Sequence, residues 1–411
     1  MKDWIKVALA INGGPRVRSR PMPSRRLFGE AELEIVRQVF EESWRTGVDF
    51  SFQGRYEELY TSAFCEFQGG GFADAVSSGT AAVYLALQAL DIPPGSEVVI
   101  SPVTDPGCVA PVVLQGHRVV IADSSPDSFN IGPDEFERAL THKTRAAVLT
   151  HSGGYPVDIQ PIVEIARSRE IKIVEDCSQA HGALYKGKRV GRFGDVAAFS
   201  TMFSKNHATG GCGGIVYTED KEIYWKVRAL ADRGKPFDRP DFNPKDPSQF
   251  LFPALNFNLD ELSCAIGYST LARLPETIEK RNVIAARIDA GLRKSLVVSP
   301  CRKPQDCNPS PFFHSVAVDV DSLDVSKIEF AEAVAAEGMP INPHYRYVVS
   351  EWPWLKPYLT HKKNTPNAIR FRDRSFNILF HERYTDGDID DIIDAILKVE
   401  AHLTKRVGLA V

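Results

Sequence analysis

Short apolar segments alternate with helical segments between residues 72 and 218, and this alternation constrains the fold more than any other feature. Alternating strands and helices predict a mostly parallel sheet that helices cover. Helices with apolar periodicity are expected at residues 81–90 and 159–170. Strands are expected at residues 72–76, 97–103, 117–123, 171–176, 195–200 and 214–218, with another that begins at residue 145.

The 411 residues are enough for a large domain, a smaller second domain and a sizeable core. A net charge of -4 gives no reason to expect a nucleic acid or an anionic membrane as partner. No apolar run is long enough to span a bilayer, and the first residues have too short an apolar core for a signal peptide. The seven scattered cysteines match neither a disulfide framework nor metal-binding spacing, so a reducing cytoplasm and no metal are expected.

The two ends of the chain differ from its centre. Residues 11–28 contain five arginines and little apolar periodicity, which indicates an extended arm that is either solvated or reaches a partner subunit or an anionic substrate. After residue 274 the pattern changes to a long polar helix that leads into a smaller C-terminal domain. We therefore predict an arm with a large domain at residues 1–274 and a small domain at residues 275–411.

An acidic pair, Glu175 and Asp176, ends one predicted strand, and Lys205 follows the next one along the chain. Such side chains converge at the carboxyl edge of an open α/β sheet, where ligands usually bind. A lysine and an acid are what pyridoxal phosphate requires, because the lysine forms a Schiff base and the acid keeps the pyridine nitrogen protonated. An isolated pair of this kind is more often a surface lysine and a helix-capping aspartate.

A Ser-Ser-Gly-Thr turn at residues 77–80 opens a predicted helix. Free backbone N–H groups at a helix N-terminus suit a phosphate, although a plain cap formed by Ser78 or Thr80 explains the same residues. Two further polar residues have two interpretations each. Asp105 is either a helix cap or a pocket group, and His151 is either a satisfied core histidine or a pocket residue.

Several motifs occur together and in order along most of the chain: VSSGTAAVYLAL, EDCSQAHGA, YKGKRVGRFGDVAAFS, SKNHATGG, LNFNLDELSCAIG and HERYTDGDID. With them the sequence resembles the DegT/DnrJ/EryC1/StrS family of pyridoxal-phosphate-dependent sugar and cyclitol aminotransferases. The resemblance implies an α/β type I aminotransferase fold. In that fold a large domain with a mostly parallel, seven-stranded sheet flanked by helices is joined to a smaller α+β C-terminal domain.

The resemblance also implies roles for individual residues. Lys205 is expected to form the Schiff base and to act as the base that moves the substrate proton, and Asp176 to pair with the pyridine nitrogen. Gln179 is expected to bond the cofactor near its ring hydroxyl or its phosphate. The remaining cofactor residues, which are expected to hold the phosphate, are Gly79, Thr80 and Ser200.

Three more residues are expected at the border of the site by the same resemblance. Asn256 matches an asparagine that reaches the phosphate of the neighbouring subunit's cofactor, which implies a homodimer with shared active sites. His344 and Arg346 match a segment that borders the substrate pocket, where arginine geometry suits the donor's carboxylate; a surface role is an equal alternative for Arg346.

The sequence departs from the family pattern in three places. The loop after Lys205 is one residue longer than usual and lacks a glutamate. Asn258 stands where an arginine is usual, and residues 104–106 offer no aromatic side chain to stack on the cofactor ring. No stacking residue is therefore assigned.

The predicted function is amino transfer from L-glutamate or L-glutamine to a keto-sugar, nucleotide-linked or not, or to a keto-cyclitol. A second hypothesis is a sugar dehydratase, a branch of the family with histidine in place of the lysine; here it requires a one-residue slip toward His207. A third is a regulatory homologue without turnover, which predicts a missing lysine or acid, and both are present.

Overall fold

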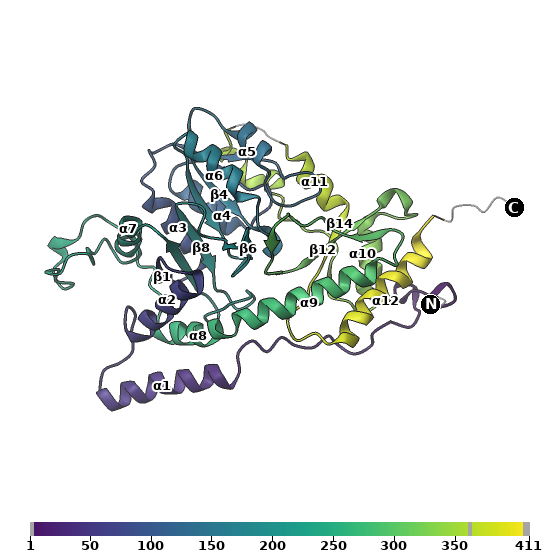
Figure 1. The fold of residues 1–411 in the computed structure, drawn as a ribbon, viewed down its shortest axis with the longest axis horizontal. Helices are drawn as coiled ribbons and strands as arrows, with labels where there is room; N and C mark the ends of the chain where they lie inside the picture. Colours follow the sequence, from purple (N-terminus) through teal and green to yellow (C-terminus); the bar gives the residue numbers. More distant parts are fainter. Residues whose placement is uncertain (1–3, 361–363, 406–411) are drawn as a thin grey trace.

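The computed structural model describes residues 4–360 and 364–405. A large sheet with helices on both faces lies beside a smaller sheet that has helices of its own (Figure 1). Within the described residues, no helix has both the length and the apolar composition that a membrane crossing requires. Short 3-10 helices lie at Trp4–Lys6, Ala10–Asn12, Ser152–Gly154, Pro247–Gln249, Val320–Ser322, Val349–Glu351 and Pro353–Tyr358.

The large sheet is mostly parallel, as predicted. Strands β3, β2, β4, β5 and β8 run parallel to one another, and β9 pairs antiparallel with both β8 and β1. In sheet order the strands are β1 (Phe72–Val76), β9 (Gly214–Thr218), β8 (Val196–Ser200), β5 (Lys172–Asp176), β4 (Thr144–Thr150), β2 (Glu97–Ile100) and β3 (Arg118–Ile121).

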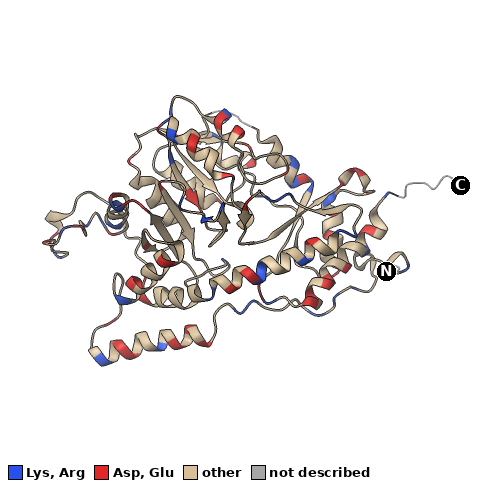
Figure 2. Cartoon of the chain, in the orientation of Figure 1, with Lys and Arg blue, Asp and Glu red and all other residues tan. Residues whose placement is uncertain are grey.

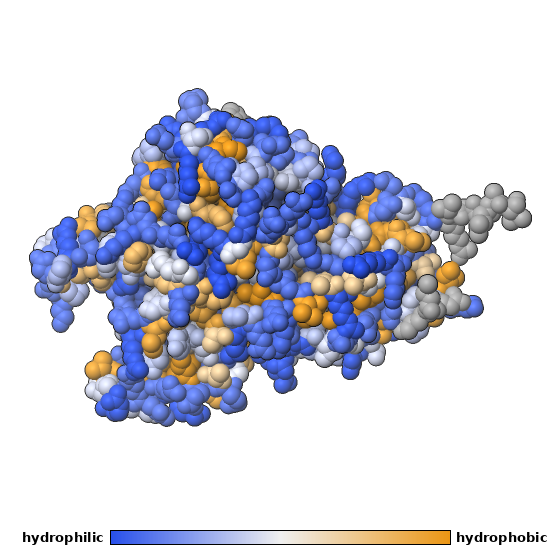
Figure 3. All heavy atoms as spheres, in the orientation of Figure 1, coloured by the Kyte–Doolittle hydropathy of each residue, from blue (hydrophilic) through white to orange (hydrophobic). Residues whose placement is uncertain are grey.

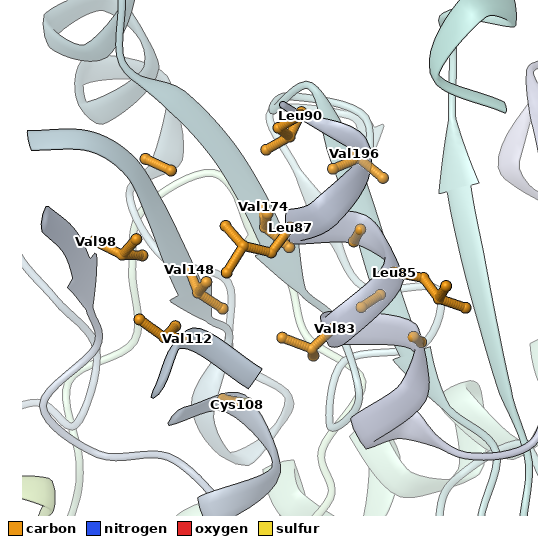
Figure 4. Close-up of a cluster of buried hydrophobic side chains, with 14 of the residues drawn as sticks. Val83, Leu85, Leu87, Leu90, Val98, Cys108, Val112, Val148, Val174 and Val196 are labelled. Atoms are coloured by element: carbon orange, nitrogen blue, oxygen red, sulfur yellow. The ribbon is translucent and has the colours of Figure 1, made fainter. Parts of the chain in front are cut away.

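Side chains of the large sheet alternate between two buried faces. Val98 of β2 packs with α3 (Gly79–Ala89) and α4 (Pro106–Leu114). The next residue, Val99, packs with α5 (Pro133–Ala139) and α6 (Ile159–Ser168) on the opposite face. Figure 4 shows Leu87 of α3 among strand valines on the first face. Because each fully buried aliphatic side chain contributes about 1.5–3 kcal/mol, this double burial accounts for the continuous apolar runs in the sequence.

The helices of this part follow the predicted alternation. A Gly at the C-terminal end of both α1 and α2 adopts a left-handed conformation and stops each helix. The helices are α1 (Glu30–Thr46), α2 (Arg55–Gln68), α3 (Gly79–Ala89), α4 (Pro106–Leu114), α5 (Pro133–Ala139), α6 (Ile159–Ser168), α7 (Lys221–Ala231) and α8 (Glu261–Ala272).

The second, antiparallel sheet has its own hydrophobic core, in which Phe330 and Phe376 are fully buried. Its strands, in sheet order, are β10 (Val298–Pro300), β12 (His314–Val318), β14 (Ser375–Ile378) and β13 (Ile341–Asn342). Its helices are α9 (Leu274–Leu292), α10 (Lys327–Ala336), α11 (Pro366–Asp373) and α12 (Asp386–Leu403). Helix α9 begins at the predicted change of pattern and runs from one sheet to the other (Figure 1).

A three-stranded ribbon connects the two parts of the chain. Strand β6 lies at its centre, since it pairs with both β7 and β11. Strand β11 comes from the segment between α9 and β12, whereas β6 belongs to the large part of the chain, so this pairing joins the two parts. The ribbon consists of β11 (Cys307–Asn308), β6 (Leu184–Tyr185) and β7 (Lys188–Arg189).

The N-terminal arm is extended from residue 14 to residue 28 and lies along the second sheet's helices. It passes near the beginning of α12, which is rich in acidic residues (Figure 2). Glu337 accepts a hydrogen bond from the N–H of Val17, and the Arg18 guanidinium lies 2.7 Å from the Asp388 carboxylate with both side chains 4% exposed. Arg18 therefore forms a buried ion pair within its own chain. The sequence predicts an arm that is either solvated or in contact with a partner subunit or an anionic substrate, and neither describes Arg18.

Candidate active site

The carboxyl ends of β5 and β8 bring the predicted acid and lysine to one edge of the large sheet. These two strands are parallel neighbours, with Asp176 opposite Ala198. Lys205 lies in the loop after β8, and its Nζ is 4.7 Å from the centre of the Phe312 ring. The ring face attracts a cation, so Phe312 helps to fix the position of the ammonium group.

Burial lowers the pKa of the Lys205 ammonium below its ordinary value, although the negative charges of Asp176 and Asp105 act in the opposite direction. A lowered pKa increases the fraction of neutral amine, which is the form that attacks a carbonyl carbon. The environment of Lys205 thus favours covalent chemistry.

Asp176 is 3% exposed and its carboxylate is held by three donors. The Cys108 thiol and the Thr150 hydroxyl lie 2.6 and 3.3 Å from Oδ2, and the Ser178 N–H donates to Oδ1. Burial and the adjacent carboxylate both raise the pKa of the Cys108 thiol, which therefore keeps the proton that it donates. The sequence did not single out Cys108, which lies in the first turn of α4, or Thr150, which is the last residue of β4.

The neighbouring acid, Glu175, belongs to the fold rather than to the site. Its carboxylate accepts the N–H groups of Gly191, Phe193 and Gly194 and pairs with His151 Nε2 at 3.1 Å. Burial raises the pKa of Glu175, but these donors outweigh burial and hold it below its ordinary value.

His151 is a satisfied core histidine, the first of its two predicted interpretations. Its ring is fully buried, and Nδ1 accepts a hydrogen bond from the Val157 N–H at 2.9 Å. Since Nδ1 accepts, Nε2 carries the ring proton and donates it to Glu175.

The turn before α3 meets the end of β8. Ser78 caps the helix by accepting the Ala81 N–H at 3.1 Å, so the expected cap is present. A Cβ on Gly79 would lie 2.4 Å from the Ser200 Cβ, so only glycine allows this close approach. The first N–H groups of a helix have no partner within it, and here they lie beside the Ser200 segment at the positive end of the helix dipole.

Thr80 faces a second helix N-terminus. A Cβ on Gly107, in the first turn of α4, would meet the Thr80 Oγ1 at 2.6 Å. Asp105 caps α4 by accepting the Gly107 N–H at 2.8 Å, as its helix-cap interpretation predicted. The structure therefore brings Gly79, Thr80 and Ser200 together near the starts of two helices.

Gln179 is 8% exposed and connects the sheet edge to the second part of the chain. Its Oε1 accepts the Gly153 N–H at 2.7 Å, and its side chain hydrogen-bonds the Tyr345 phenol. The segment that contains His344 and Arg346 thus contributes Tyr345 to this contact. His344 itself is partly buried and Arg346 is exposed.

Asn256 stays outside the buried group around Lys205. It is exposed, and its Oδ1 accepts the Asn258 N–H at 3.0 Å. The segment is nevertheless anchored to the turn before α3, because the Phe257 carbonyl accepts the Ser77 N–H at 2.7 Å.

His207, two residues after the lysine, points into the protein core. The Tyr60 hydroxyl lies 2.6 Å from its Nε2, and the Thr270 hydroxyl lies 3.1 Å from its Nδ1. Burial lowers the pKa of His207 to about 3, so the ring is neutral. Lys205 and His207 therefore occupy different environments.

A mostly parallel sheet with a partly buried lysine and a buried carboxylate at its carboxyl edge defines a type I aminotransferase fold, as predicted. The DegT/DnrJ/EryC1/StrS aminotransferase family matches residues 28–397, and the chain belongs to this family. The protein is a pyridoxal-phosphate-dependent aminotransferase.

Two known relatives and two solved structures are similar to between 62% and 95% of the chain. The spore coat polysaccharide biosynthesis protein SpsC of Bacillus subtilis is 29% identical over 90% of this chain and 94% of its own. GDP-perosamine synthase of Escherichia coli O157:H7 is 32% identical over 62% of this chain and 66% of its own. An aminotransferase from Psychrobacter cryohalolentis superposes with a TM-score of 0.85 at 28% identity, covering 92% of this chain and 98% of that one. DesV of S. venezuelae, solved with a ketimine intermediate, gives 0.81 at 26% identity, covering 95% and 100%.

The residues at the sheet edge fit pyridoxal phosphate. Asp176 supplies a buried anionic acceptor, and Lys205 supplies an amine whose pKa burial lowers. The close contact between Gly79 and the Ser200 side chain leaves backbone N–H groups, a hydroxyl and a helix N-terminus together, which is the donor set that a phosphate binds.

Proposed function

We propose that the enzyme transfers the amino group of L-glutamate or L-glutamine to a keto-sugar. The observation that carries this proposal is Lys205, which is partly buried within reach of the Asp176 charge and has its Nζ against the Phe312 ring. The E. coli relative is by name a synthase of GDP-perosamine, which favours a nucleotide-linked keto-sugar over a keto-cyclitol.

Each site residue has a proposed task. Pyridoxal phosphate, when bound, supplies the ring that accepts electrons from the substrate. Lys205 anchors the cofactor and then, as a free amine, carries a proton between the substrate carbon and the cofactor. Asp176 holds the proton on the pyridine nitrogen through a charged hydrogen bond.

The phosphate is held by neutral donors and a helix dipole in this proposal. The N–H groups of Gly79 and Thr80 donate to it at the start of α3, and the Ser200 hydroxyl adds a further donor. Gln179 keeps its Oε1 on the Gly153 N–H and donates from its amide to the Tyr345 phenol, so that its second amide N–H is left to orient toward the cofactor.

The environment of His207 supports transamination over dehydration. The dehydratase hypothesis requires a histidine in the position of the lysine, but the His207 ring is fully buried and bonded to Tyr60 and Thr270. Reversing the two side chains would break both hydrogen bonds. A regulatory homologue without turnover is disfavoured because Lys205 and Asp176 are both present.

We propose that the enzyme is a cytoplasmic homodimer with shared active sites. Asn256 is exposed, as a residue that reaches a partner's cofactor phosphate must be. Helix α1 exposes Leu33, Phe40 and Trp44, the last of them 76% exposed, and apolar atoms are visible on it at the lower left of Figure 3. Sedimentation equilibrium tests the homodimer, because a monomer at micromolar concentration would contradict it.

The proposed location in the cytoplasm is supported by the cysteines. All seven are free, which suits a reducing compartment.

A half-reaction tests the amino transfer. The cofactor-loaded protein is mixed with L-glutamate or L-glutamine without acceptor, and its absorption spectrum is followed while the 2-oxoacid is measured. We expect conversion to the pyridoxamine form with one oxoacid released per site, followed by reversal when a keto-sugar is added. Consumption of the keto-sugar with loss of water, and no response to either donor, would favour the dehydratase.

A further inference from the structure

The arm residue Arg25 contacts the backbone of the lysine loop directly. Its guanidinium donates to the carbonyls of Ser204 at 3.4 Å, Lys205 at 2.6 Å and Asn206 at 3.1 Å. Three consecutive carbonyls on one planar group fix the course of the backbone at the lysine.

The opposite wall of the lysine is held in the same way. The buried Arg281 of α9 donates to the carbonyls of Pro311 at 3.0 Å and Phe312 at 3.4 Å. Its side chain is 2% exposed. The Phe312 ring, in turn, contacts Lys205 Nζ, so Arg281 positions the group that faces the amine.

One carboxylate joins the two arginines. Glu382, in the segment between β14 and α12, lies 2.9 Å from Arg25 through Oε1 and 2.9 Å from Arg281 through Oε2. Its side chain is 12% exposed, which limits solvent screening. Burial raises the pKa of Glu382, but the two guanidinium groups outweigh burial and hold it below its ordinary value, so the carboxylate stays charged.

We propose that Arg25, Glu382 and Arg281, the arginine-glutamate bridge, are positioning residues that set the place of the Lys205 amine relative to the cofactor. The bridge joins the N-terminal arm, the lysine loop and the Phe312 segment across more than 350 residues of sequence. The inference rests on the proposed role of Lys205. It differs from that proposal because none of the three residues needs to touch the cofactor.

Arg25→Met and Glu382→Gln test the bridge, with Arg18→Met as the matched control. Arg18 lies on the same arm and forms a buried ion pair with Asp388. Its side-chain hydrogen bonds and ion pairs go to the arm itself and to α12, not to the lysine loop. A purely structural role predicts the same behaviour for both arm variants. Arg25→Lys is a second variant that keeps the charge but not the planar group that spans three carbonyls.

The measurements are the pH titration of the visible absorption band of the bound cofactor, kcat and KM for the donor, and urea unfolding. We expect Arg25→Met to lower kcat about tenfold to a hundredfold with little change in KM, because a displacement of about 1 Å at a reacting group has an effect of this size. The midpoint of the pH titration should shift by about half a pH unit or more. Burial and nearby charges determine this midpoint, and Arg25→Met changes both around Lys205. Arg25→Lys should restore less than half of the loss.

The Arg18→Met control should lose stability but keep both kcat and the titration midpoint. Adding Arg25→Met to Glu382→Gln should lower kcat no further than either change alone, because the two residues act in one network. If Arg25→Met matches Arg18→Met in kcat and midpoint, the bridge is structural only and the inference is wrong. If the wild-type protein shows no visible cofactor band, the proposed function itself fails.

Discussion

At the floor of the site Asp176 is buried and Lys205 is partly buried, and neighbouring groups hold both, whereas Arg346 and Asn256, which we propose for its rim, are exposed. The floor lies at strand ends of the large sheet, and the donors to Asp176 come from α4, from the last residue of β4 and from the segment after β5. The proposed rim residues lie in segments that reach the large part of the chain through a neighbour, as Tyr345 beside Arg346 hydrogen-bonds Gln179. We propose that the sheet fixes the position of the reacting groups, while the exposed residues can vary without disturbing the fold.

Loss of the floor lysine should have the largest effect. Lys205→Ala removes both the covalent anchor and the proton carrier, so kcat for amino transfer should fall by at least about 10⁴-fold. Steady-state assays with L-glutamate and a keto-sugar measure the change. A residual rate within about a hundredfold of wild type would assign the proton transfer to another group.

Asp176→Asn should rank next. Asparagine keeps the size of the side chain but cannot hold a charge against the pyridine nitrogen, so kcat/KM should fall by about 10²- to 10⁴-fold. Cys108→Ala removes one hydrogen bond to the same carboxylate and leaves its charge, so its effect should stay below about tenfold. Equal losses in the two variants would mean that geometry, not charge, is the contribution of Asp176.

Glu175→Gln should affect stability instead of chemistry. The NH2 group of the glutamine would face backbone N–H donors, which it cannot accept. Loss of one partner from a buried, charged interaction of this kind lowers the unfolding free energy by about 3–5 kcal/mol. The folded-state pKa of Glu175 lies below its ordinary value of about 4.3. The Glu175 carboxylate therefore stabilises the folded state fully above about pH 5, and this stabilisation is lost as the pH falls through the folded-state pKa. Urea unfolding across this range, with the exposed Glu164→Gln as control, measures it. A constant difference at all pH values would contradict the assignment.

The rim should show the smallest effect. Arg346→Ala should raise KM for the donor by less than about tenfold with kcat nearly unchanged, because an exposed ion pair contributes at most about 1 kcal/mol. Arg293→Ala, an exposed arginine at the end of α9, is the control. A loss in kcat larger than that of Asp176→Asn would reverse the comparison between floor and rim.

The sheet and most of the floor could be predicted from the sequence because both depend on local signals. Asp176 and Ser200 end apolar runs, and Gly79 opens an apolar helix. The start of α12 at Asp386 also has a local signal, since Thr385 and Asp388 form a capping box. The roles of the floor residues stay predictions until the variants are measured.

Contacts between distant segments could not be predicted. Phe312 reaches Lys205 from more than 100 residues away, and Arg25 reaches it from 180 residues away. Strand β13 is limited to Ile341–Asn342, because Pro343 has no N–H to extend the pairing. Helix α7 begins at Lys221, because Asp220 caps its first N–H groups, and that signal is present in the sequence.

The identity of the anchoring lysine tests the account most directly. The cofactor-loaded protein is reduced with borohydride, digested and mapped by mass spectrometry, so that the phosphopyridoxyl group marks the lysine that held it. The account predicts a single modified peptide that carries the group on Lys205, and no modification of the Lys205→Ala variant. Modification of a different lysine, or none in wild type, would contradict the assignment of the site to the carboxyl edge of β5 and β8.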